Sequence, residues 1–385
     1  MIRLKMKIVF FIIPISMLIL SGCWNYREIN DVNIINGAAV DLSEEKEDYV
    51  LTVEIVKPLA GEEFKLEADL ISEKGKSIFD AVRTMITHSG KRGYWPHAKV
   101  FIISEDIAKK GVTEVIDFIN RDAEVRSDIW LLISKDKMAK QILECETKLH
   151  YTISAHLEDK LKNKDSISKY ESIELHQFLK DLSGDGISCT IPAVYTAKHG
   201  NDGTVPEIDG MAVFKKDKLV GYINGIETMN MMLIKDELKA GLLVIENVNN
   251  SNTDCTLEIF KSKTDVKPVM RDGNIIMKID SELDVSIAEI VGSEDLISEP
   301  GRIKLKAEAE EYVKKEVLKT IQRVQKDYAS DIFGFGNNIY RKMPNEWKKI
   351  KDDWDEMFPH LKVDVNVKVN IKGSALTSKP IKVGD

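Results

Sequence analysis

The chain has 385 residues, of which 43% are hydrophobic and 31% are charged, and its formal net charge at pH 7 is −8. This share of apolar residues supports packed cores and argues against a disordered chain. The acidic balance argues against a nucleic-acid-binding protein. The length predicts two or three domains.

The N-terminus has the pattern of a bacterial export signal. Arg3, Lys5 and Lys7 precede an uncharged, largely apolar run over residues 8–20. A membrane-spanning helix needs about 20 apolar residues, so the run is too short to span but suits the core of a signal peptide. The run ends in Leu-Ser-Gly-Cys at residues 20–23, which resembles the lipobox of bacterial lipoproteins. We expect residues 1–22 to be removed as a signal peptide; an ordinary secretory signal is the alternative.

Cys23 would then carry a diacylglyceryl group, and two acyl chains are enough for stable membrane attachment. The remaining cysteines are Cys145, Cys189 and Cys255. Three cysteines do not make a disulfide framework. We expect three buried, reduced thiols, with one disulfide among them as the alternative.

The first part of the mature chain alternates strands and helices. Residues 34–41 and 49–57 are predicted strands around a charged turn at 43–47, and residues 66–70 alternate like a third strand. A helix is predicted from its cap at Ser77 to Gly90. Further strands are expected at 100–103 and 129–133, and helices at 112–120, 138–161 and 173–182. The pattern predicts a mixed α/β or α+β fold, with mixed sheets covered by helices.

Turn-forming residues between 200 and 206 suggest a domain boundary. We therefore expect an N-terminal α/β domain over residues 23–200, either single or subdivided, and a C-terminal α+β domain over residues 206–385. The second half should hold a hairpin with its turn at 215–218, a helix at 227–239, and strands at 242–246, 255–260, 274–278 and 283–289.

The last hundred residues differ in character. An apolar stripe with spacings of three and four predicts one long amphipathic helix over residues 303–329. Residues 362–373 alternate valine or isoleucine with polar residues, which predicts a half-buried strand. We expect the long helix to cover the sheet that contains this strand; a partner-binding helix is the alternative.

The sequence offers no recognisable catalytic motif. It contains no nucleophile elbow, no zinc-protease motif and no P-loop, and its seven histidines do not pair at helical metal-site spacing. Residues 181–186 resemble the start of a calcium loop, but Pro192 occupies the position of the bidentate glutamate. We therefore predict no catalytic residues, no cofactor and no metal.

Three segments carry a family resemblance. They are GCWNYREIN at 22–30, GMAVFKKDKLVGYING at 210–225, and DIFGFGNNIYRKMPNEWKKIKDDWDEMFP at 331–359. Together they resemble the spore-germination lipoproteins that form the C subunits of GerA-type nutrient germinant receptors. The resemblance implies a non-catalytic α/β protein, anchored by Cys23 to the outer face of the spore inner membrane. It also implies assembly with membrane A and B subunits.

Two groups of residues are candidates for partner contact. Trp24, Tyr26 and Arg27 lie next to the expected lipid, where they would contact headgroups or a partner unless the segment packs on the body. A second group, spaced at seven and four residues on one predicted helical face, would form either a partner surface or core. Its members are Trp347, Trp354 and Phe358.

The sequence leaves two other functions open. A substrate-binding lipoprotein of an ABC-type transporter is the main alternative, but such proteins have two similar lobes around a ligand cleft, and the two halves of this chain differ. A lipid-anchored hydrolase is the third alternative, and it lacks any motif in this sequence.

Overall fold

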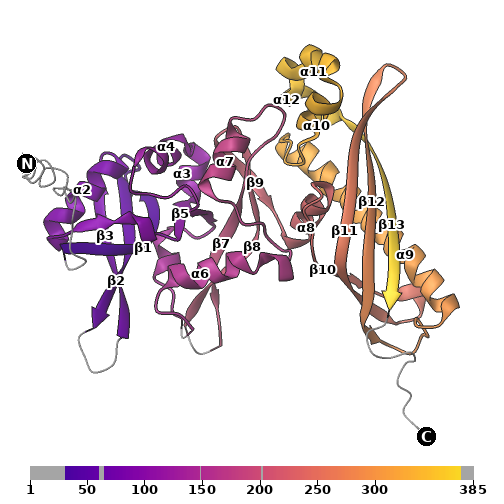
Figure 1. Cartoon of the computed structure of the whole chain (residues 1–385), viewed down its shortest axis with the longest axis horizontal. Coiled ribbons are helices and arrows are strands. Elements are labelled where there is room, and N and C mark those ends of the chain that lie inside the picture. The colour runs from indigo at the N-terminus through magenta and orange to yellow at the C-terminus, as the bar shows by residue number, and fades with distance from the viewer. Residues whose placement is uncertain (1–30, 60–64, 148, 201–202, 374–385) are drawn as a thin grey trace, which may run out of the picture.

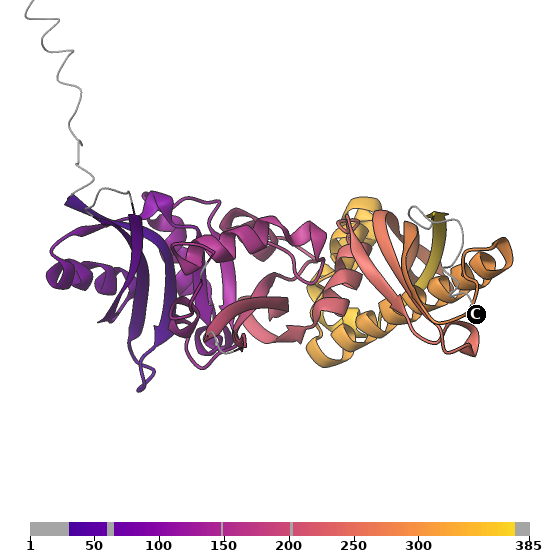
Figure 2. The ribbon, with the colours of Figure 1, turned by 90° about the horizontal axis from the view of Figure 1, so that it is seen from below.

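The computed structural model describes residues 31–59, 65–147, 149–200 and 203–373. They form an elongated molecule in which two β-sheets follow one another along the long axis (Figures 1 and 2). Helices pack on both sheets, which confirms the predicted fold class. Within the described ranges, no helix is both long enough and apolar enough to span a bilayer.

The first sheet has nine strands in the order β3-β2-β1-β5-β6-β7-β8-β9, with β4 beside β1. The inner strands β1, β5, β6 and β7 are parallel, and antiparallel pairs flank them on both sides. The strands are β1 (Val32–Leu42), β2 (Tyr49–Leu59), β3 (Lys65–Gly75), β4 (Arg92–Tyr94), β5 (Val100–Ser104), β6 (Trp130–Ser134), β7 (Thr190–Lys198), β8 (Thr204–Lys215) and β9 (Lys218–Ile223).

Helices α2 to α7 occur in the connections between the strands of this sheet. They are α2 (Ile78–Ser89), α3 (Glu105–Lys110), α4 (Thr113–Arg121), α5 (Lys140–Leu143), α6 (Ile153–Lys162) and α7 (Leu175–Leu182). The predicted ends of α2 are confirmed: the Ser77 side chain accepts a hydrogen bond from the amide of Asp80, and Gly90 ends the helix in the left-handed conformation.

One long helix over residues 138–161 was expected, and this prediction was wrong. The segment is divided into α5 and α6 because two buried carboxylates from the sheet bind their first turns. Asp41 on β1 accepts from the amides of Ala139 (2.6 Å) and Lys140 (3.1 Å). Glu54 on β2 accepts from the amides of Ile153 (2.7 Å) and Ser154 (2.9 Å). Each carboxylate satisfies amides that have no partner within their own helix.

The domain boundary expected at residues 200–206 falls within the first sheet, because β7 ends at Lys198 and β8 begins at Thr204. These strands pair antiparallel from Lys198 and Thr204 onward, so the first sheet continues through β9. We propose that the structural boundary lies after Ile223, the last residue of β9.

The second sheet has the order β10-β11-β12-β13. Its strands are β10 (Gly241–Ile245), β11 (Asp254–Arg271), β12 (Asn274–Val291) and β13 (Lys362–Gly373). The predicted strands at 274–278 and 283–289 are parts of the single strand β12. Asp272 and Gly273 both have positive φ and form the tight turn between the two long strands.

The predicted long helix is α9 (Glu299–Arg323), which ends in one π-helical turn over Val324–Tyr328. It packs on β13 and buries its apolar stripe, Val313, Val317, Ile321 and Val324. The expectation that it covers its own sheet is confirmed. Helix α8 (Gly225–Ile234) lies between the two sheets, and α10 (Phe335–Lys342), α11 (Pro344–Ile350) and α12 (Trp354–Met357) gather beside one end of the second sheet (Figure 1).

Candidate functional site

The residues predicted to mediate membrane attachment lie outside the described residues. They are Cys23, Trp24, Tyr26 and Arg27. Their lipidation and contacts therefore stay predictions. The three other cysteines are described, and all three are free and buried, as expected.

Of the two alternatives for the aromatic group, a partner surface or core, the structure shows core. Trp347, Trp354 and Phe358 are 3%, 5% and 1% exposed. The ring centroids of Trp347 and Trp354 are 5.4 Å apart, and those of Trp354 and Phe358 are 6.2 Å apart. The segment folds into the short helices α11 and α12, which turn these rings inward. The group stabilises the fold and offers no exposed face to a partner.

The region where the two halves of the molecule meet, here called the junction, contains a close backbone contact. It lies between the segment that joins α7 to β7 and the start of α10. The amide of Asn337 donates to the carbonyl of Gly186 (2.9 Å), and the amide of Ser188 donates to the carbonyl of Asp331 (2.8 Å). Gly186 belongs to the calcium-like segment 181–186, so this segment is the end of α7 and the turn that follows it at the junction. Within the described part of the chain, no group of three or more His, Cys, Asp or Glu residues could hold a metal ion.

Charged side chains strengthen the junction. The Asp331 carboxylate is buried and accepts from the amides of Phe335 (3.1 Å) and Gly336 (2.8 Å) at the start of α10. Burial raises its pKa to about 7, against the opposing effect of these amides. Arg323 at the end of α9 donates to both carboxylate oxygens of Glu227 on α8, each at 2.5 Å. These buried, hydrogen-bonded contacts indicate a rigid connection between the two halves of the molecule.

A second junction feature is a polar depression of about 770 Å³ between α7 and α10. Lys235 lies at its edge, 3.3 Å from a carboxylate oxygen of Glu171 and 2.9 Å from one of Glu237. Burial raises the pKa of the nearby Asp181 carboxyl. The charges lining the depression are mixed, and the lysine is already satisfied by its neighbours.

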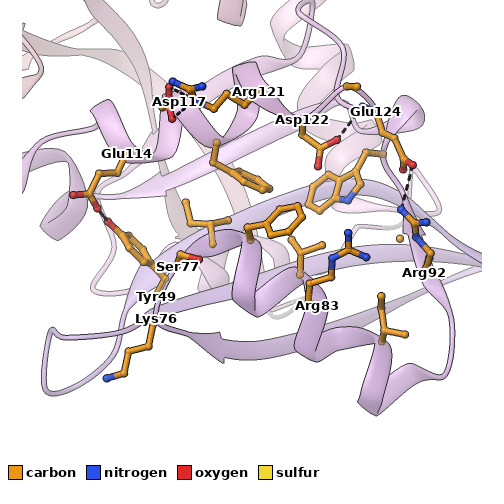
Figure 3. A pocket seen from close by; sticks show the side chains of 18 residues that line it. Tyr49, Lys76, Ser77, Arg83, Arg92, Glu114, Asp117, Arg121, Asp122 and Glu124 are labelled. Atoms are coloured by element: carbon orange, nitrogen blue, oxygen red, sulfur yellow. Dashed lines mark hydrogen bonds and ion pairs between the residues drawn. The ribbon is translucent and has the colours of Figure 1, made fainter.

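A largely apolar groove of about 670 Å³ lies between α2 and α4 (Figure 3), at the end of the molecule away from the junction (Figure 1). Trp95 and Phe118 form its floor, with ring centroids 6.3 Å apart in an edge-to-face arrangement. Phe79, Val82 and Ile86 from α2 form one wall. The groove therefore combines an aromatic floor with an aliphatic and aromatic wall.

The rim of the groove is charged, and most of its charges are paired. Arg121 donates from Nε to both oxygens of Asp117 (2.8 and 2.6 Å). Arg92 lies 3.6 Å from Glu124. Tyr49 donates to Glu114, and burial together with this carboxylate raises the pKa of the Tyr49 hydroxyl.

Arg83 differs from the other rim cations. Its guanidinium lies over the ring of Phe79, 4.9 Å from the centroid. Among the described residues it has no carboxylate partner. Arginine over an aromatic face in this way remains able to form a bidentate pair with a carboxylate.

Sequence reasoning did not find this groove. The available signal was Phe79, which with Val82 and Ile86 gives α2 a second apolar stripe beside the face that packs on the sheet. The floor could not be found in the same way, because Trp95 and Phe118 lie on different elements that only the fold brings together.

Two family models match the chain. The model described as "Spore germination protein N-terminal domain" matches residues 25–195, and the model described as "Spore germination B3/ GerAC like, C-terminal" matches residues 209–375. The two matches leave residues 196–208 unmatched, and the hydrogen-bonded first sheet continues to Ile223.

Full-length relatives are similar as well. Spore germination protein KC of Bacillus subtilis (strain 168) is 25% identical and aligns over 96% of this chain and 96% of its own length. Spore germination protein GerQC of Bacillus cereus is 24% identical over 97% of this chain and 100% of its own length. The crystal structure of the GerBC protein has a similar fold, with a TM-score of 0.57 at 20% identity, and covers 87% of this chain and 97% of that one.

Proposed function

Because the chain belongs to the family of spore germination proteins that the two GerAC models describe, we propose that it is the lipid-anchored C subunit of a nutrient germinant receptor. The observation that carries the proposal is the similarity along almost the whole chain. Both family domains are present in order. The alignments with spore germination proteins KC and GerQC cover nearly the full lengths of those relatives.

In this proposal Cys23 carries the diacylglyceryl anchor and holds the described body on the outer face of the spore inner membrane. The body then contacts the membrane A and B subunits. Attachment through two acyl chains suits a chain whose described helices include none able to span a bilayer.

We propose a binding role without catalysis. The structure supports this because three of its buried carboxylates, Asp41, Glu54 and Asp331, accept backbone amides at helix starts. Two others, Glu171 and Glu227, are paired with Lys235 and Arg323. The transporter alternative requires two similar lobes, and the two sheets here differ, with nine strands in one and four in the other.

Deletion of the gene in its own host tests the proposal. We expect spores of the deletion strain to lose germination with one class of nutrient while still germinating with triggers that bypass receptors. A copy of the intact gene should restore the response. Normal germination on every nutrient, in a strain with no related subunit left, would contradict the proposal.

A further inference from the structure

Helix α2 carries two apolar stripes, although its contact with the sheet needs only one. Ile78, Ala81 and Met85 are buried beneath the helix. Phe79, Val82 and Ile86, at spacings of three and four, instead line the groove. Phe79 is 49% exposed, so α2 presents a large apolar side chain to solvent beside the groove.

The groove has the length of a short helix. It extends beside α2 from Ser77, which caps the helix, to Arg92, which follows its end. At 1.5 Å per residue, the 12 residues of α2 extend about 18 Å. Figure 3 shows the apolar side chains between two rows of charged ones, which is the pattern that an amphipathic helix in a groove requires.

The charges of the rim indicate one feature of the occupant. The other arginines of the groove, Arg92 and Arg121, are paired with Glu124 and Asp117. Arg83 alone among the groove arginines contacts an aromatic ring and no carboxylate of the described residues. A carboxylate on the occupant would complete its environment.

The position of the groove indicates where the occupant comes from. Val32, the first residue of β1, pairs with Arg92 at one end of the groove. The nine residue-to-residue steps from Cys23 to Val32 reach at most about 30 Å when extended. If Cys23 is lipidated, as the proposed function assumes, this end of the groove stays close to the membrane surface.

We propose that the α2–α4 groove binds an amphipathic helix of a membrane-embedded receptor subunit. This inference rests on the proposed function. The helix would present apolar residues at spacings of three and four to Phe79, Val82 and Phe118. It would also place an aspartate or glutamate against Arg83.

Site-specific photo-crosslinking tests the proposal in intact spores. A photo-reactive benzoylphenylalanine replaces Phe79 in one strain and Phe260 in another. Phe260 is a matched control, because it is 50% exposed and lies on β11 of the other sheet. We expect an adduct at position 79 with an amphipathic segment of a membrane-embedded subunit, identified by mass spectrometry, and at least tenfold less of it at position 260.

Charge variants give a second, independent measurement. Phe79→Asp and Arg83→Glu should each lower co-purification of the membrane subunits by about tenfold, while Phe260→Asp leaves it unchanged. Both groove positions are exposed, so the melting temperature of the purified variants should stay close to that of the unmodified protein. An unchanged yield of complex with Phe79→Asp would overturn the proposal.

Other occupants would produce other results. An adduct at position 79 with a second copy of this chain, or saturable binding of a small molecule in place of any adduct, would overturn the proposal. Failure of the groove proposal is distinguishable from failure of the proposed function. If deletion abolishes a nutrient response but Phe79→Asp does not weaken the complex, the receptor role stands and the groove assignment is wrong.

Discussion

Gly186 and Gly336 lie backbone against backbone where the first sheet meets the helices of the second. A Cβ atom added to Gly336 would lie 2.6 Å from the Cα of Gly186 and 2.8 Å from Nε1 of Trp354. The same is true in reverse, since a Cβ on Gly186 would lie 2.7 Å from the Cα of Gly336. Neither glycine therefore has room for a side chain at this contact.

Gly336→Ala should therefore destabilise the protein by about 1–3 kcal/mol, the usual cost of overpacking. Gly373→Ala is the control, because a Cβ at that position meets no atom within 4 Å. Thermal unfolding followed by circular dichroism measures both variants. Equal melting temperatures for the two would show that the junction yields to an added methyl group.

Asp331 should make stability fall with rising pH. Its folded pKa of about 7 lies above its ordinary value of 3.8, so the folded state holds the proton over a range where the unfolded chain has lost it. The contribution is full below about pH 4 and is lost as pH rises through about 7. Relative to Asp331→Asn, the unfolding free energy should fall by about 4 kcal/mol across this range, because each unit of pKa shift corresponds to about 1.4 kcal/mol. Urea unfolding at several pH values measures it, and a difference that grows with pH would contradict the assignment.

Arg323→Leu should destabilise the protein by about 3 kcal/mol, because it leaves the carboxylate of Glu227 buried without its cation. The double variant with Glu227→Gln should recover part of the loss. Lys349→Leu is the control, since it breaks an exposed pair with Glu346 that contributes about 1 kcal/mol or less. Equal effects of Arg323→Leu and Lys349→Leu in urea unfolding would refute a stabilising role for the junction pair.

The three described cysteines should resist alkylation in the folded protein. Burial raises the pKa of the Cys255 thiol to about 11 and also raises the pKa values of Cys145 and Cys189. The thiolate is the reactive form, so both access and ionisation are unfavourable. Iodoacetamide at neutral pH should leave all three unmodified by mass spectrometry, and concentrated urea should expose all three. Rapid labelling of the folded protein would contradict the burial of these thiols.

Cys23→Ala should abolish incorporation of a labelled fatty-acid analogue, because it removes the only thiol expected to accept the lipid. Cys189→Ala, at a buried position, is the matched control and should keep full incorporation. The measurement is metabolic labelling followed by gel fluorography. Equal label in the Cys23→Ala variant and the unmodified protein would end the lipoprotein proposal.

Most individual elements could be predicted from the sequence, because their signals are local. The cap at Ser77, the end at Gly90, the turn at Asp272 and Gly273, and the apolar stripe of α9 each depend on a few neighbouring residues. The packing of α9 on its own sheet could be predicted because α9 has one apolar stripe and β13 has one apolar face. The family, too, was recognisable from short segments, since these keep their order and spacing.

Three features depended on tertiary contacts. The break between α5 and α6 comes from Asp41 and Glu54, which are about a hundred residues away in sequence and bind the helix starts as acceptors. The inward turn of Trp347 and Trp354 depends on where α11 and α12 fold back, which periodicity alone does not specify.

The groove is the clearest case of this dependence. The residues of one wall are three and four apart on α2, so the chain itself places them on one side of a helix. How close they lie to Phe118 and Trp95 depends on how the elements pack together. The same packing leaves Arg83 without a carboxylate partner among the described residues. The sequence therefore determined which surfaces are apolar, because side-chain periodicity is a local property. Only the tertiary structure decided which of these surfaces are covered, because covering is done by residues distant along the chain.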